Sequence, residues 1–260
     1  MAHSLSSALN LGSAPAENMT LWKWELEAEL SSIPHLSREE RRVGFGGFKS
    51  EDMNKSPVFG RARLNLGLPA GFTAQLSWTP SLEIKGARPD DLYGLALERS
   101  LVSNGRWQLG GRLHAVRGHA RSDVTCSRRI ARIEPGTPGN PFGCTEPSRD
   151  RIRMDQQGAE LMLSRSMGSG RWQSFIAYAS TRMDPFTAVE AKLFDSDHNA
   201  SLGSKGTVET YSVGASFAAS PRWRLSAAFS YTPLDVRRPP LRERANGDFS
   251  SFRVALAWRQ

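Results

Sequence analysis

The chain has 260 residues, of which 39% are hydrophobic and 23% are charged, with 34 Lys and Arg against 26 Asp and Glu. It has no run of 18 consecutive apolar residues, which excludes a transmembrane α-helix. A transmembrane β-strand remains open, because it needs only about ten residues with every second side chain apolar. Residues 1–18 are mostly small or polar, and we expect a flexible N-terminal tail there, followed by a single domain over residues 19–260.

The first ordered segment alternates between two kinds of side chain. Even positions from 22 to 30 hold Trp, Trp, Leu, Ala and Leu, whereas the odd positions are charged: Lys23, Glu25, Glu27 and Glu29. Successive side chains of a β-strand point to opposite faces. The pattern therefore predicts a strand with one apolar and one charged face.

The same alternation continues along the chain and predicts an all-β fold. The polar face of the next two segments carries Arg61, Arg63 and Gln75, and that of the last segment carries Arg253. One segment fits less well, because Met162 occupies a polar position in it. The ten predicted strands cover residues 20–30, 58–68, 72–81, 92–102, 106–116, 157–167, 171–181, 208–218, 222–232 and 249–259.

The connections between these strands fall into two groups. Four are tight turns rich in Gly, Asn, Ser or Pro, which is typical of hairpins. The other five are long and span residues 31–57, 82–91, 117–156, 182–207 and 233–248. With ten strands, every tight turn lies at one end with both termini, and every long loop lies at the other. This segregation predicts a transmembrane antiparallel up-and-down β-barrel with short periplasmic turns and long extracellular loops.

Alternation alone also fits a soluble β-fold that keeps its apolar face inside, but two features favour the inverted arrangement. The polar face carries both signs of charge, as a confined lumen requires, since an unpaired buried charge is costly. Aromatic residues gather near strand ends, as the girdles of membrane barrels do: Trp107, Trp172, Trp223 and Trp258. We expect the lumen to be lined by Lys23, Glu25, Glu27, Glu29, Arg61, Arg63, Gln75, Arg112, Glu160, Arg224 and Arg253, with the glutamates of the first strand paired to arginines including Arg61, Arg63 and Arg253.

The last strand carries a resemblance to a known class of proteins. From Phe252 to Trp258 it resembles the C-terminal assembly signal of bacterial outer-membrane β-barrels, although Arg259 and Gln260 follow the final aromatic residue. The resemblance covers the superfamily and indicates no particular family. It implies an integral outer-membrane protein surrounded by lipid and lipopolysaccharide, with no nucleic acid among its partners.

The longest loop holds both cysteines, Cys126 and Cys144, for which an exported protein predicts a disulfide, with two free thiols as the alternative. The same loop is rich in arginine. Its Arg128, Arg129 and Arg132 are candidates for binding an anionic glycan or lipopolysaccharide phosphate, since guanidinium groups form forked bonds to such anions. The alternative is an ordinary solvated loop.

Other chemistry finds little support in the sequence. No Cys/His spacing suits a metal, no cofactor motif is convincing, and we assign no catalytic residue. The acidic stretch Asp195–His198 only loosely resembles the rim of omptin-type surface proteases. Ten strands enclose a narrow interior. We therefore expect a narrow channel for ions or small polar solutes, with a closed surface protein that binds anionic glycans as the main alternative and a rim protease as a further one.

Overall fold

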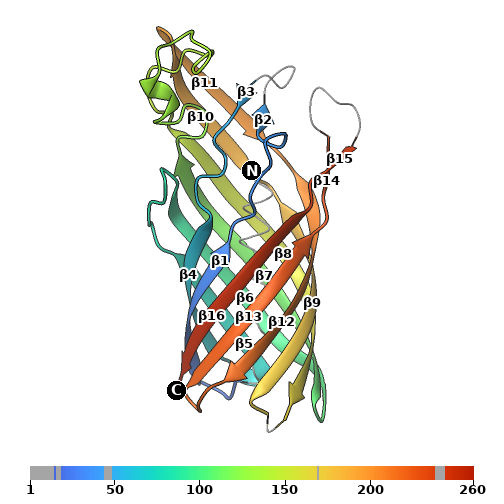
Figure 1. Cartoon of the computed structure of the whole chain (residues 1–260). Helices are drawn as coiled ribbons and strands as arrows, with labels where there is room; N and C mark the ends of the chain where they lie inside the picture. The colour runs from blue at the N-terminus through green and yellow to red at the C-terminus, as the bar shows by residue number, and fades with distance from the viewer. Residues whose placement is uncertain (1–14, 16–18, 44–48, 169, 238–243) are drawn as a thin grey trace.

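The structure, a computed structural model, describes residues 15, 19–43, 49–168, 170–237 and 244–260. Apart from Pro15, the tail predicted over residues 1–18 lies outside them. Ten strands form a closed antiparallel barrel in the order β8, β7, β6, β5, β4, β1, β16, β13, β12 and β9, and β9 pairs back with β8 (Figure 1). The predicted ten-stranded barrel is therefore confirmed. No helix among the described residues is long and apolar enough to span a membrane.

The barrel strands begin and end close to their predicted positions. They are β1 (Trp24–Ser32), β4 (Val58–Gly67), β5 (Phe72–Thr79), β6 (Arg88–Asn104), β7 (Trp107–Ser122), β8 (Asp150–Met167), β9 (Trp172–Met183), β12 (Gly206–Ala218), β13 (Trp223–Thr232) and β16 (Phe249–Arg259). The first strand starts at Trp24 instead of residue 20. Strands β6, β7 and β8 extend further toward the long loops than predicted, which shortens the loop that holds both cysteines to residues 123–149.

The long loops contain structure of their own at the upper end of Figure 1. The hairpin of β10 (Phe186–Leu193) and β11 (Ser196–Gly203) continues the sheet, because β10 pairs with the upper part of β8. The remaining short elements are β2 (Arg42–Val43), β3 (Lys49–Ser50), β14 (Asp235–Arg237) and β15 (Arg244–Asn246), with one 3₁₀ turn at η3 (Ile130–Arg132) and another, η2 (Pro69–Gly71), in the tight turn between β4 and β5.

The two faces of the barrel wall differ as the alternation predicts. In β1 the three glutamates are buried, while Leu26 and Leu30 are exposed on the outside. Apolar side chains of other strands face outward in the same way, with Leu113 63% and Ile176 57% exposed. A surface this apolar suits lipid, so the barrel is inverted relative to a soluble one.

Candidate functional site: the lumen and the loop end

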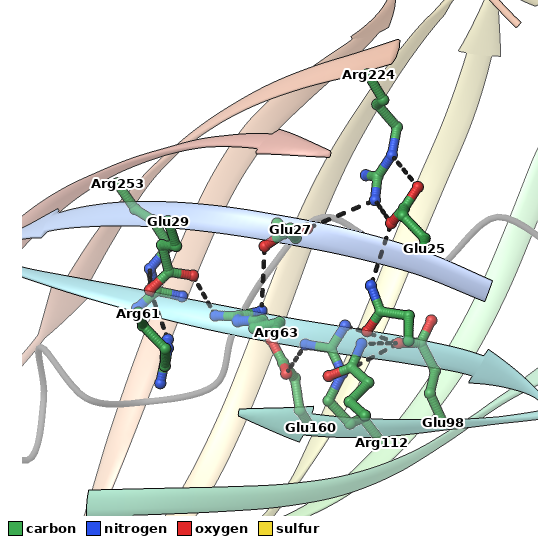
Figure 2. A network of polar contacts seen from close by, with 12 residues as sticks. Glu25, Glu27, Glu29, Arg61, Arg63, Glu98, Arg112, Glu160, Arg224 and Arg253 are labelled. Carbon is green, nitrogen blue, oxygen red and sulfur yellow. Dashed lines mark hydrogen bonds and ion pairs between the residues drawn. The ribbon is translucent and has the colours of Figure 1, made fainter. Parts of the chain in front are cut away.

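A network of ion pairs joins inward-facing side chains of several barrel strands (Figure 2). Glu29 of β1 lies at its centre and contacts three arginines of the neighbouring strands: Arg61 at 2.6 Å, Arg253 at 3.4 Å, and Arg63. The cause is register, since β4 and β16 are the strands that flank β1, and Arg61 lies directly opposite Glu29. None of these side chains is more than 5% exposed.

Two further arginines, Arg112 and Arg224, complete the network. Arg112 of β7 donates to Glu98 of β6 at 2.7 Å and to Glu160 of β8 at 2.8 Å. Its two partners lie directly across from it on the flanking strands.

Arg224 of β13 reaches past the small Ala257 of the intervening strand β16 to Glu25, and also lies 3.6 Å from Glu27. In all, five arginines meet five glutamates, so the network as a whole is electrically neutral: Arg61, Arg63, Arg112, Arg224 and Arg253 with Glu25, Glu27, Glu29, Glu98 and Glu160.

The structure places the other predicted lumen residues as follows. Gln75 is buried in the lumen, with its amide 3.5 Å from Glu98. Lys23 is a correction: it lies just before β1 and is exposed, because the alternation continues in sequence beyond the point where the strand begins. Glu98 is a lumen residue that the sequence reasoning missed, although it lies on the polar face of its predicted strand.

Above the network, toward the long loops, β4, β6, β7 and β8 present apolar side chains to the lumen. We call this group the apolar layer; its buried members are Phe59, Leu92, Ala96, Val116, Ile152 and Met154, with Ile33 packed against them. On each strand these residues lie closer to the loop end than the charged residues do. Water and ions cross a packed apolar constriction poorly. Two different groups, the ion-pair network and the apolar layer, thus occupy the lumen one above the other along these strands.

Aromatic side chains ring the outside at two heights. Trp107, Trp172, Trp223 and Trp258 are exposed at the tight-turn end. Tyr178, Tyr211 and Tyr231 lie side by side across three strands nearer the loops, and Trp78 lies opposite Tyr93 on two others. Trp223 and Tyr231 are separated by about 26 Å along one tilted strand, at roughly 3.3 Å per residue. At the usual tilt of about 35–45° this distance corresponds to a height of about 20 Å, somewhat below the roughly 25 Å of a membrane barrel's apolar band.

The predicted disulfide joins Cys126 to Cys144, with an S–S distance of 2.00 Å. Asn140 holds the same loop together by accepting a bond from the Cys144 N–H and donating to the carbonyl of Ile133. The three arginines predicted to bind anions lie at η3, beside Cys126, and are exposed. Arg128 already has a partner, because it pairs with Glu83 at 3.2 Å.

A more concentrated group of arginines lies on the outer wall just above the upper aromatic ring. Arg88 of β6, Arg121 of β7 and Arg151 of β8 are direct cross-strand neighbours, and we call them the arginine row. Arg121 forms an ion pair with Asp90 at 2.7 Å. No described carboxylate lies within 4.0 Å of Arg88 or Arg151.

The arginine row borders a cleft of about 670 Å³, which also contains Arg149. We call it the arginine cleft. Several of its acids have other partners: Asp150 accepts from the Thr125 N–H, and Glu146 pairs with Lys192. Arg149, like Arg88 and Arg151, has no described carboxylate within 4.0 Å. The lining of the cleft carries five arginines and five acids, so its formal charges balance, but Arg88, Arg149 and Arg151 form no direct ion pair with a described carboxylate.

The acidic stretch considered for a protease lies in the hairpin, where Asp197 and His198 are exposed residues of β11. Asp90, another acidic residue of the loop end, belongs to β6 and forms an ion pair with Arg121. Among the described residues, no group of His, Cys, Asp and Glu is arranged to hold a metal ion.

Comparison with known proteins supports the fold and nothing finer. No family model and no curated protein matches the sequence. The structure is similar to the translocator domain of the autotransporter NalP from Neisseria meningitidis, with a TM-score of 0.53 and 10% identity over 100% of this chain and 96% of that one. It is also similar to the outer membrane protease OmpT from Escherichia coli, with a TM-score of 0.51 and 10% identity over 95% of this chain and 100% of that one. The chain has the fold of integral bacterial outer-membrane β-barrels, and its outward apolar band is suited to that membrane.

Proposed function

We propose that this protein is a closed barrel that binds an anionic glycan, bearing phosphate or sulfate groups, at the arginine cleft. The proposed role is non-enzymatic. The observation that carries it is the arginine row, in which Arg88, Arg121 and Arg151 lie directly across from one another on three strands. Guanidinium groups bind phosphate and sulfate oxygens through forked, charge-assisted hydrogen bonds.

Energetics support this choice of ligand. Like charges directly opposite each other on neighbouring strands destabilise a sheet. Asp90 offsets part of that cost at Arg121, but no described acid does so at Arg88, Arg149 or Arg151. A bound anion would supply the missing negative charge. The location, above the aromatic ring and outside the lipid, would let the cleft meet glycans at the cell surface.

The narrow-channel hypothesis receives less support from the same geometry. A pore needs a polar path, whereas here a neutral network of buried ion pairs is followed by the apolar layer. An open aqueous lumen would also leave the charged side chains hydrated, but Glu29, Arg61 and Arg63 are at most 4% exposed.

Binding can be tested with protein refolded into lipid nanodiscs and titrated with a sulfated dextran oligosaccharide. We expect Arg88→Gln and Arg151→Gln each to weaken binding about tenfold, the effect of losing a charged hydrogen bond. The matched control is Arg222→Gln, which removes an exposed arginine at the tight-turn end. Affinity should fall steeply with rising salt.

A second arm replaces the soluble glycan with liposomes that contain lipopolysaccharide, which separates a free glycan from a membrane-borne one. Equal affinity of the wild type and the Arg88→Gln/Arg151→Gln double variant in both arms would contradict the proposal. An equal loss in Arg222→Gln would do the same, because it would show that only net charge matters.

A further inference from the structure

A second cavity lies at the loop end, on the inner side of the wall that carries the arginine row. Pro89, Ala120 and Ile152 adjoin the three arginines on β6, β7 and β8, each one residue closer to the tight turns. They also lie directly across from one another. Adjacent residues of a strand face opposite sides. All three line this cavity, which we call the mouth cavity.

The lining of the mouth cavity is mostly apolar. Its floor is the upper side of the apolar layer, where Ile152 and Met154 are each 2% exposed. Its rim includes Leu82, which is 65% exposed, so the cavity extends from the buried lumen to the outer surface. Prolines and aliphatic residues form the walls between them: Pro34, Pro57, Pro80, Ile84 and Ala87.

The polar side chains of its loop lining already have partners within the protein. Asn54 accepts from the Leu36 N–H and donates to the Leu36 carbonyl. Ser56 donates to the Val58 carbonyl, and Lys55 pairs with Asp52 and Asp123. These loop groups are therefore engaged within the protein, and although the strand residues Arg88, Arg121 and Ser122 also reach the lining, most of it is apolar. Water gains little in the apolar part of the cavity, since a buried water needs two to four polar partners.

The volume of the mouth cavity limits which ligands it can hold. The cavity measures about 160 Å³. A dry apolar cavity of about 150 Å³ is large enough for benzene. We propose that the mouth cavity binds a small apolar molecule of about one aromatic ring or a short aliphatic chain. Arg88 and Arg121 border both this cavity and the arginine cleft, but the apolar part of the cavity can bind a ligand without an anion in the cleft.

The cavity ends at a barrier. Below the apolar layer lies the network of buried ion pairs around Arg112 and Glu29, whose side chains are almost fully enclosed. An apolar molecule gains nothing from entering a charged region and would disrupt pairs that are costly to break. The cavity is thus a place of capture at the outer surface and does not open into a path across the membrane.

The test is a methyl NMR titration with benzene, using full-length protein in lipid nanodiscs labelled at Ile and Met methyl groups. The Ile152 and Met154 signals should shift and saturate. Ile176 faces lipid and reports how much benzene simply dissolves in the membrane. Ala120→Phe, which fills the cavity, should weaken binding roughly tenfold or more. Ala115→Phe adds the same volume on the lipid-facing side of the same strand and should leave binding unchanged.

Folding of each variant is checked by its heat-modifiable migration on a gel, and Ala87→Phe serves as a second filling variant if Ala120→Phe does not fold. The proposal is overturned if the Ile152 shift is linear and parallels that of Ile176. It is also overturned if a folded filling variant binds benzene as the wild type does. Magnetisation transfer from lipid chains to Ile152 without benzene would overturn it too, by showing that a lipid chain occupies the cavity.

Discussion

Arginine occurs in two very different surroundings in this barrel. In the lumen, five arginines meet five glutamates and are shielded from water. At the loop end, Arg88, Arg149 and Arg151 lie at a wide cleft without a described carboxylate within 4.0 Å. The difference is one of neighbours and not of residue type. The arginines of the lumen are paired with glutamates, whereas Arg88, Arg149 and Arg151 form no direct ion pair with a described carboxylate.

The largest expected effect comes from breaking the paired group. Glu29→Ala removes the carboxylate that Arg61, Arg63 and Arg253 all contact, so it leaves excess positive charge in an enclosed space. We expect the free energy of unfolding in lipid vesicles to fall by about 3–5 kcal/mol. Urea titration, followed by tryptophan fluorescence, measures this quantity.

Glu134→Ala is the control for that measurement, because Glu134 is an exposed residue of the loop. It should change stability by less than about 0.5 kcal/mol. Similar losses in the two variants would mean that the lumen network contributes no more than a surface charge does, and the contrast between the two groups of arginines would disappear.

The smallest expected effect has the opposite sign and concerns the unpaired group. Arg151→Gln removes a positive charge opposite Arg121 in the arginine row. Without ligand, it should stabilise the barrel by about 0.2–1 kcal/mol, since like charges across strands repel. The gain should shrink in 1 M salt, where the screening length is only about 3 Å. A loss of stability at low salt would show that Arg151 has a structural partner.

The sequence alone predicts the barrel well because its two faces meet different solvents. Lipid outside and packed polar or charged side chains inside impose the same alternation on nearly every spanning strand, from Glu25 in β1 to Arg253 in β16. The alternation does not mark strand ends, which is why Lys23 was placed in the lumen although it precedes β1. The hairpin β10–β11 was missed because β11 is exposed along its whole length, so no binary pattern marks it.

The loop-end sites depend on register, which the sequence does not display. Arg88, Arg121 and Arg151 belong to three strands and become neighbours only when those strands pair. The sequence instead predicts an anion-binding site at Arg128, Arg129 and Arg132, because these residues are close together in the chain. The apolar layer was hidden for another reason: Phe59 and Leu92 occupy the inward positions of their strands, where a lumen was expected to be polar.

Conductance across a planar bilayer tests the central claim, that the lumen is closed, most directly. Wild-type protein delivered by fusion of lipid vesicles should give no unitary current steps in 1 M KCl, because the neutral ion-pair network and the apolar layer leave no aqueous path. Insertion is verified independently by the heat-modifiable gel migration of protein recovered from the same vesicles. Stable, uniform conductance steps from wild-type protein would contradict the account and restore the narrow channel as the better explanation.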